Sequence, residues 1–154
     1  MSNKLNDPMY YLELLKKKYD VHYKAKDLTK TNCLYLVEQM NGRGKKNDWY
    51  AGKTINSAIQ RLYQHLTKQS DCIKQNMELN NTKRIRLYVI DYNITSSDEL
   101  ADKEKKLIDK LFAEDKKRTI NRDFRGCPKA LENLSNQGYT KQIHKNRLGI
   151  VQYI

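Results

Sequence analysis

The sequence has few cysteines and no long apolar run, and both shortages limit what the protein can be. Its 154 residues include three cysteines and three histidines. Cys33, Cys72 and Cys127 are far apart and odd in number, so they predict neither a disulfide framework nor a zinc knuckle. No segment is apolar enough for a membrane-spanning helix, and residues 1–7 lack the apolar core of a secretory signal. We therefore expect a cytoplasmic protein with reduced thiols and no membrane partner.

Acidic residues are scarce relative to basic ones. The 30 lysines and arginines against 18 aspartates and glutamates give a formal net charge of +12. Such a surface attracts polyanions, because binding releases the counterions condensed on their phosphates. Nucleic acid is the partner that we expect, and an anionic membrane surface is the other polyanion that the charge alone would allow. The chain has the length of one domain, residues 1–154, and no repeat, linker or low-complexity segment divides it.

Short apolar or alternating segments predict the strands. The clearest is at residues 83–91, where Ile85, Leu87 and Val89 alternate with polar residues. Two further segments flank a turn-rich basic loop at residues 41–47, which predicts a β-hairpin. The expected strands are residues 32–40, 49–51 and 83–91, with a further terminal strand at 149–154.

Capping signals and apolar periodicity predict the helices. Ser57 with Gln60 forms a capping box that opens a helix over residues 57–68. Ser96 with Glu99 opens a longer helix, which we expect to run to about Ala113. Further helices are predicted from Asp7 and Pro8, over residues 71–79, and from Pro128. The expected fold is an α/β (α+β) domain with a small, mostly antiparallel three-stranded sheet flanked by helices.

One carboxylate interrupts the apolar face of the long helix. Glu104 shares that face with Leu100, Ile108 and Leu111, whereas the other charged residues of the helix lie mainly outside it. Burying a carboxylate is costly unless it is paired or holds a metal. The helix alone favours a structural ion pair and a metal ligand equally.

Two residues of the preceding helix form a second candidate pair. Arg61 and His65 are four residues apart, so their side chains project next to each other beside the apolar stripe. Exposed Arg and His pairs at this spacing are common, and the pair alone favours a plain surface position.

An ordered set of residues connects these features. Two tripeptides, Cys-Leu-Tyr at residues 33–35 and Tyr-Ala-Gly at 50–52, lie on the two strands of the hairpin. With the later helices, the set comprises Tyr35, Tyr50, Arg61, His65, Glu104 and Asn121. This order resembles the GIY-YIG nuclease family, in which two tripeptides on adjacent strands precede Arg-x-x-x-His, then a Glu and an Asn. Both tyrosines and the last glycine match, whereas Cys33, Leu34 and Ala51 replace a glycine and two isoleucines.

The resemblance covers roughly Asn32 to Arg125 and implies how the chain is organised. Residues 32–125 would form the catalytic core, residues 1–31 an N-terminal helical extension, and residues 126–154 a C-terminal tail. The chain length suits a small stand-alone endonuclease of phage, mobile-element or restriction type. A double-strand break would require a homodimer during cleavage, because one active site cuts one strand.

The resemblance also implies a divalent-metal-dependent DNA endonuclease. Glu104 would hold a single Mg²⁺ or Mn²⁺, with Glu99 and Glu114 as rival ligands on the same helix. Arg61 would hold the scissile phosphate through its forked donors. Tyr35 would activate water, and we expect adjacent cations to favour its phenolate.

The other residues of the set would support these groups. Tyr50 and His65 would orient water and phosphate or assist proton transfer, and Asn121 would tie its segment to the site through its amide. The expected nucleic-acid contacts, with double-stranded DNA as the partner, are Arg43, Lys45, Lys46, Lys53, Arg122 and Arg125. A non-catalytic nucleic-acid-binding module with the same fold is the alternative. The RNP-type aromatic strand and the GXXG loop of common RNA-binding modules are absent from the sequence.

Overall fold

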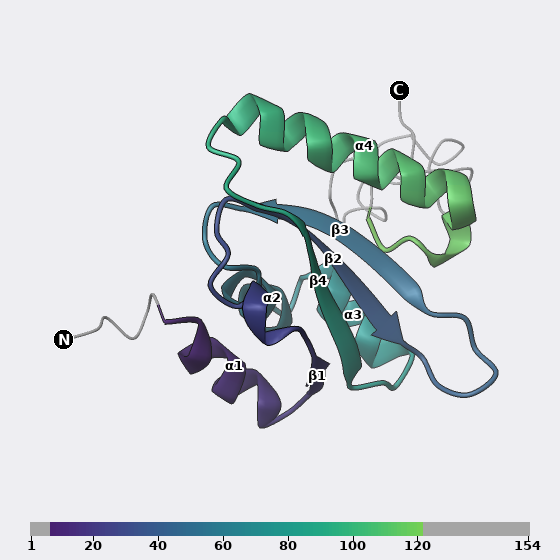
Figure 1. The fold of residues 1–154 in the computed structure, drawn as a ribbon. Helices are drawn as coiled ribbons and strands as arrows, with labels where there is room; N and C mark the ends of the chain where they lie inside the picture. The colour runs from purple at the N-terminus through teal and green to yellow at the C-terminus, as the bar shows by residue number, and fades with distance from the viewer. Residues whose placement is uncertain (1–6, 122–154) are drawn as a thin grey trace.

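The computed structural model describes residues 7–121, which form one layered unit (Figure 1). Its elements, in chain order, are α1 (Pro8–Lys16), β1 (Asp20–His22), η2 (Ala25–Asp27), β2 (Cys33–Met40), β3 (Asp48–Thr54), α2 (Ala58–Thr67), α3 (Cys72–Leu79), β4 (Arg84–Asp91), α4 (Ser97–Asp115) and η3 (Lys116–Arg118). The mixed α/β class expected from the sequence is confirmed. The helix predicted from Pro128 and the strand predicted at 149–154 lie outside the described residues.

Within residues 7–121 the sheet has four strands in the order β1-β4-β2-β3, so the prediction of three strands is wrong. Strand β2 pairs antiparallel with both β3 and β4, whereas β1 runs parallel to β4. β1 has only three residues, and Val21 is the only buried one, so it carries no alternating pattern that a sequence could show. Most of the pairing is antiparallel, as expected.

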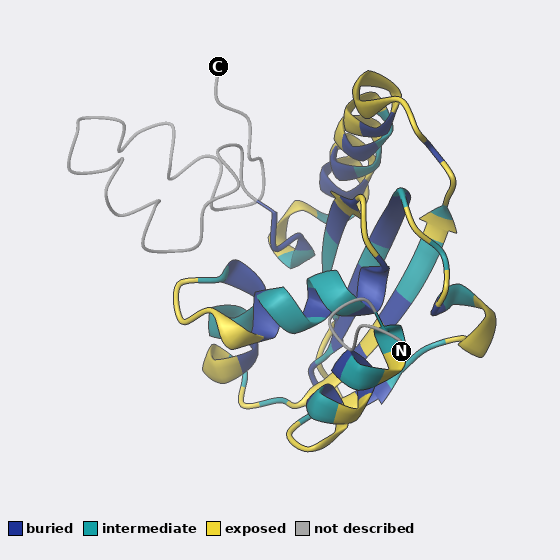
Figure 2. Cartoon of the chain, turned by 90° about the vertical axis from the view of Figure 1, so that its left-hand side faces the viewer, coloured by how far each residue is buried: buried dark blue, intermediate teal, exposed yellow. Residues whose placement is uncertain are grey.

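Helices cover the two faces of the sheet unequally. Helices α1, α2 and α3 pack on one face, where the main core includes Tyr35 and Val37 of β2 together with Leu62 of α2. The other face is covered by α4, whose buried stripe packs on Ala51 and Leu34. Figure 2 shows this stripe along α4 and the exposed surface on its other sides. The sheet therefore lies between two apolar layers.

Side-chain caps fix where α1, α2 and α4 begin. The Ser57 hydroxyl accepts a hydrogen bond from Gln60 N at 3.3 Å, and Ser96 accepts one from Glu99 N at 3.2 Å, so both predicted cap positions are confirmed. Asp7 caps α1 by accepting from Met9 N at 3.0 Å. Each cap satisfies a backbone N–H that the helix leaves without a partner.

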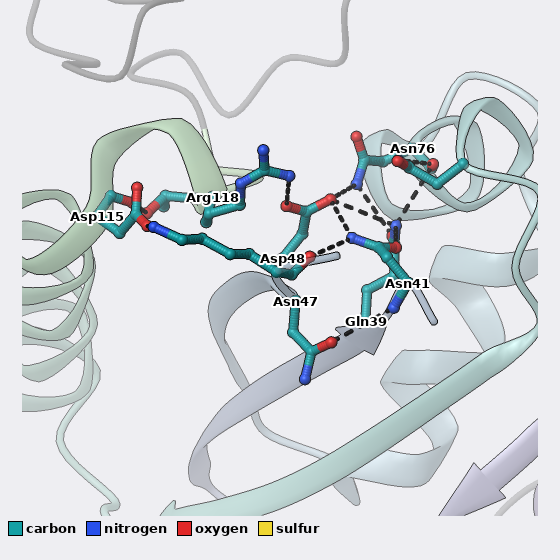
Figure 3. Close-up of polar contacts among 10 residues, drawn as sticks. Gln39, Asn41, Asn47, Asp48, Asn76, Asp115 and Arg118 are labelled. Carbon is teal, nitrogen blue, oxygen red and sulfur yellow. Dashed lines mark hydrogen bonds and ion pairs between the residues drawn. The ribbon is translucent and has the colours of Figure 1, made fainter. Parts of the chain in front are cut away.

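A buried polar network holds the hairpin against α3 and the segment after α4 (Figure 3). The Asp48 carboxylate accepts hydrogen bonds from Asn41 Nδ2 at 3.0 Å and Asn76 Nδ2 at 2.9 Å. Its other oxygen pairs with Arg118 at 3.3 Å. Gln39, which is fully buried, completes the network through Asn41 Oδ1 at 2.7 Å. One carboxylate therefore connects β3 to two segments that are distant in the sequence.

None of the helices within residues 7–121 combines the length and apolar character that crossing a membrane would require.

The described part of the expected N-terminal extension, from Asp7 on, shares the core of the domain. Leu12 and Leu15 of α1 are buried in the same cluster as Tyr35 and Leu62. We predict that Leu12→Ala lowers the free energy of unfolding by about 2–5 kcal/mol, because it removes a fully buried side chain and leaves a cavity. Urea denaturation measures this. Met9→Ala, at a position 44% exposed on the same helix, should change it by less than about 0.5 kcal/mol. If both substitutions change the free energy of unfolding by the same small amount, α1 does not contribute to the core of the domain.

Candidate active site

The Tyr35 side chain reaches the edge of the sheet by passing over Gly52 of the neighbouring strand β3. In the β2–β3 register Tyr35 lies directly opposite Gly52. A side-chain carbon on residue 52 would lie 2.5 Å from Tyr35 Cζ and closer still to its hydroxyl oxygen. The backbone of Gly52 is not in the left-handed region, so this position requires glycine for space alone. The last residue of the second tripeptide thus makes room for the last residue of the first.

Two further rings pack beside Tyr35. Tyr50 stacks on it with ring centroids 6.4 Å apart, and the His65 ring meets Tyr50 edge-on at 5.0 Å. His65 is buried, with 3% of its surface exposed, and lies on the same buried face of α2 as Leu62. Arg61, one turn earlier, is half-buried and donates to Gln64 Oε1 at 3.1 Å. The predicted pair on this helix therefore faces the rings of the hairpin.

Glu104 approaches the same place from the other face of the sheet. It lies on the buried stripe of α4, as predicted, and 5% of its surface is exposed. Helix α4 packs on β3, which is the edge strand of the four-stranded sheet. Glu99 and Glu114, the rival ligands, are both exposed.

Asn121 ties the segment after α4 to the second tripeptide. Its amide nitrogen donates to the Ala51 carbonyl oxygen at 2.8 Å, and its amide oxygen accepts from Ala51 N at 2.8 Å. The neighbouring Ile120 N donates to the Trp49 carbonyl oxygen at 2.7 Å. Asn121 is almost fully buried, with 1% exposed. The predicted tie through its amide is therefore confirmed, and its side chain takes the place that a neighbouring strand would have.

These side chains surround one cleft of about 330 Å³ at the edge of β3. Five of the six residues in the predicted set line it, and Asn121 supports the strand behind it. The full lining is Tyr35, Tyr50, Lys53, Arg61, His65, Lys68, Ser70, Asp71, Cys72 and Glu104. Three cations and two carboxylates thus share a space large enough for a phosphate group and several water molecules.

A chain of hydrogen bonds leads from the cleft into the protein. The Tyr35 hydroxyl lies 2.7 Å from His65 Nε2, and His65 Nδ1 lies 2.7 Å from Asp71 Oδ2. A carboxylate accepts hydrogen bonds only, so Nδ1 carries a proton. In the neutral ring Nε2 is then the acceptor, and the Tyr35 hydroxyl donates to it.

Burial determines the acidity of the two tyrosines. Burial raises the pKa of Tyr35 well above its ordinary value of 10.0, the neighbouring Tyr50 raises it too, and the charge of Arg61 only partly opposes them. Burial also raises the pKa of Tyr50, helped by the carboxylates of Asp71 and Glu104. The expectation that adjacent cations favour a Tyr35 phenolate is therefore wrong, because desolvation of the charged form outweighs the effect of Arg61. Both phenols are neutral.

Several predicted nucleic-acid contacts lie away from the cleft. Arg43, Lys45 and Lys46 are exposed on the loop between β2 and β3 and do not line it. Lys53 does line it. Arg122 and Arg125 lie outside the described residues.

Sequence reasoning missed Asp71, together with Lys68, Ser70 and Cys72 on the same side of the cleft. A helix start at residue 71 was predicted, and Asp71 does cap α3 by accepting from Ile73 N at 2.9 Å. The available signal was a capping carboxylate six residues after a candidate histidine. It identifies a helix start without showing that the turn directs the second carboxylate oxygen toward His65.

Comparison of the chain with protein-family models, with curated proteins and with solved structures found no match in any of the three. The functional interpretation therefore rests on the geometry of the cleft and on the sequence pattern that led to it.

The close contact between Gly52 and Tyr35 gives a direct test of the site's construction. We predict that Gly52→Ala lowers the free energy of unfolding by about 1–3 kcal/mol, because the added methyl group displaces the Tyr35 ring. Without that obstacle, the same change in a strand would stabilise the protein slightly. Urea denaturation of the single variants and the double variant measures the coupling.

Tyr35→Leu removes the hydroxyl oxygen and the ring atoms Cζ and Cε1, which are the three atoms closest to the added carbon. The double variant should therefore recover part of the loss, with a coupling energy of about 0.5 kcal/mol or more. Strictly additive effects would contradict the proposed steric cause.

Proposed function

We propose that this protein is a divalent-metal-dependent endonuclease that hydrolyses phosphodiester bonds in DNA, in the manner of the GIY-YIG nucleases that its sequence resembles. The observation that supports this most is the convergence in one cleft of Tyr35, Tyr50, Arg61, His65 and Glu104. These residues come from two strands and two helices on opposite faces of the sheet. A purely structural role for each would not require all five to border the same open space.

The charge of the cleft suits a phosphodiester substrate. Lys53, Arg61 and Lys68 border it, and the whole chain carries a formal charge of +12. Arg61 has a permanent charge and five N–H donors. Its hydrogen bond to Gln64 Oε1 uses one of these donors. We assign Arg61 to the scissile phosphate, where it would balance the charge that builds up in the transition state. Lys53 and Lys68 would contact the flanking phosphates.

Tyr35 and His65 would move the proton of the attacking water. As the water oxygen attacks phosphorus, its proton passes to the Tyr35 oxygen, and the Tyr35 proton passes to His65 Nε2. Tyr35 starts and ends neutral in this sequence, which fits its raised pKa. The bond from phosphorus to the leaving sugar oxygen breaks, and that oxygen takes up a proton from solvent. Tyr50, in contact with both rings, would hold the water in line.

Glu104 is the residue that would hold the metal. Its carboxylate borders a space that also admits water and phosphate oxygens, the ligands that Mg²⁺ or Mn²⁺ prefers beside one or two carboxylates. When bound, the ion would supply positive charge that stabilises the developing charge on the phosphate and the leaving oxygen. A double-strand break would take two such sites, and we propose a homodimer on duplex DNA during cleavage.

Replacing the proposed metal ligand tests the nuclease function. We predict that Glu104→Gln lowers the nicking rate of supercoiled plasmid with Mg²⁺ or Mn²⁺ by at least about 100-fold, as EDTA does with the wild type. DNA binding should be kept or become tighter, because the change removes a negative charge. Glu114→Gln, on the exposed end of the same helix, is the matched control and should cut like the wild type.

The same assay distinguishes the nuclease from a non-catalytic nucleic-acid-binding protein. If the wild type cuts no DNA with any divalent metal while both proteins bind DNA with steep salt dependence, the protein is a non-catalytic clamp. The exposed Arg43 and Lys45, which lie away from the cleft, would then carry the binding.

Arg61→Lys separates charge from geometry at the proposed phosphate site. The substitution keeps the positive charge but loses the planar fork, so we predict a fall in kcat of about 100-fold with little change in KM. Single-turnover cleavage with pre-bound DNA measures the chemical step. Arg86→Lys, at an exposed position on β4, is the control. A rise in KM with an unchanged kcat would reduce Arg61 to a general DNA contact.

A further inference from the structure

Asp71 uses its two carboxylate oxygens for different purposes. One oxygen, Oδ1, accepts from Ile73 N at 2.9 Å and so begins α3. The other, Oδ2, lies 2.7 Å from His65 Nδ1 near the end of α2. The Asp71 side chain is 14% exposed and that of His65 is 3% exposed, so the contact between them is largely shielded from water. A capping bond alone would leave the second oxygen free to face solvent.

The second contact determines which nitrogen of His65 faces Tyr35 as an acceptor. A neutral imidazole carries one proton, and the other nitrogen accepts. Because Asp71 offers no proton, it favours the form with the proton on Nδ1. Nε2, which is 2.7 Å from the Tyr35 hydroxyl, is then the nitrogen able to take a proton. The opposite form would direct an N–H group at the Tyr35 oxygen, and a proton could not move from Tyr35 to the ring.

We propose that Asp71 is a positioning residue for catalysis, which fixes His65 in the tautomer that accepts the Tyr35 proton and stabilises the imidazolium formed when it does. This inference rests on the proposed nuclease function, which assigns no role to Asp71. In the step concerned, the Tyr35 O–H bond breaks as the oxygen gains a proton from water. The proton released from Tyr35 forms a bond to His65 Nε2, and the positive charge of the ring is balanced by the Asp71 carboxylate.

The local structure makes this arrangement rigid. The cap bond fixes the Asp71 carboxylate relative to α3, and Ile73 next to it is fully buried. Leu62 and Leu66, which are buried beside His65 on α2, hold that helix in the main core. The two partners are thus held by different helices, and only the short turn at residues 68–70 separates them along the chain. A carboxylate held on both sides is pre-organised to receive charge when the proton arrives.

Asp71→Asn separates the two roles of the side chain. Asparagine caps helices about as well as aspartate, so α3 should be kept. If the amide oxygen stays on Ile73 N, the amide nitrogen faces His65 Nδ1 as a donor and favours the tautomer with the proton on Nε2. We expect kcat for DNA cleavage to fall about 100-fold or more, with KM almost unchanged. Asp7→Asn is the matched control, because Asp7 caps α1 in the same way through a bond of 3.0 Å to Met9 N.

The tautomer itself is measured without any cleavage. Long-range ¹H–¹⁵N spectra distinguish protonated from unprotonated imidazole nitrogens when the ring is neutral. In a background of His22→Gln and His144→Gln, free of any histidine tag, His65 is the only histidine. We expect the proton on Nδ1 in this background and on Nε2 after Asp71→Asn, whereas Asp7→Asn should leave it on Nδ1.

These results separate the inference from the function on which it rests. A proton on Nε2 before any change at residue 71 overturns the proposal, even if Asp71→Asn fails to fold. An unchanged tautomer and full activity in Asp71→Asn also overturn it. A shift of the proton together with a loss of kcat, neither seen in Asp7→Asn, supports it. If the wild type cuts no DNA, the nuclease function falls, while the spectra still decide how Asp71 orients His65.

Discussion

The site depends on how closely one aromatic ring packs across one strand. Tyr35 belongs to the central strand β2, yet its hydroxyl lies at the cleft beyond β3. It reaches that position because Gly52 has no side chain to obstruct the ring. Once the ring lies there, Tyr50 stacks on it, and His65 meets its hydroxyl from α2. A side chain on residue 52 would meet the Tyr35 ring, so the ring would have to leave this position.

The edge of β3 is completed by parts of the chain that come late in the sequence. Asn121 forms two hydrogen bonds to the backbone of Ala51, and Ile120 bonds to Trp49. The pair between Arg118 and Asp48 fixes the start of this segment. Among residues 7–121, β3 is the edge strand of the sheet, and the cleft lies beside it with α4 on one face and α2 on the other.

The sequence predicted the parts of the molecule that have strong local signals. Capping serines located α2 and α4, and a carboxylate on an apolar stripe identified Glu104 as buried. Strand β1 was not predicted, because its three residues are too few to show an alternation of apolar and polar side chains, and its parallel partner β4 is distant in the sequence. The acidity of Tyr35 was misjudged for a related reason. Local charges were visible in the sequence, whereas the burial that outweighs them arises only when helices cover the sheet.

The loop between β2 and β3 is less constrained by its neighbours than the turn that precedes Asp71. Gly42 and Gly44 adopt positive φ angles of 103° and 79°, and neither has a neighbouring atom within 4 Å of where a side chain would begin. At the base of the loop, Asn41 donates to the Lys46 carbonyl oxygen at 3.0 Å and closes it independently of its tip. Extra residues inserted at this tip would leave the cleft intact, whereas a single insertion at residues 68–70 would move Asp71 away from His65. The hairpin loop is therefore the point at which this fold can change its length without moving the residues that line the cleft.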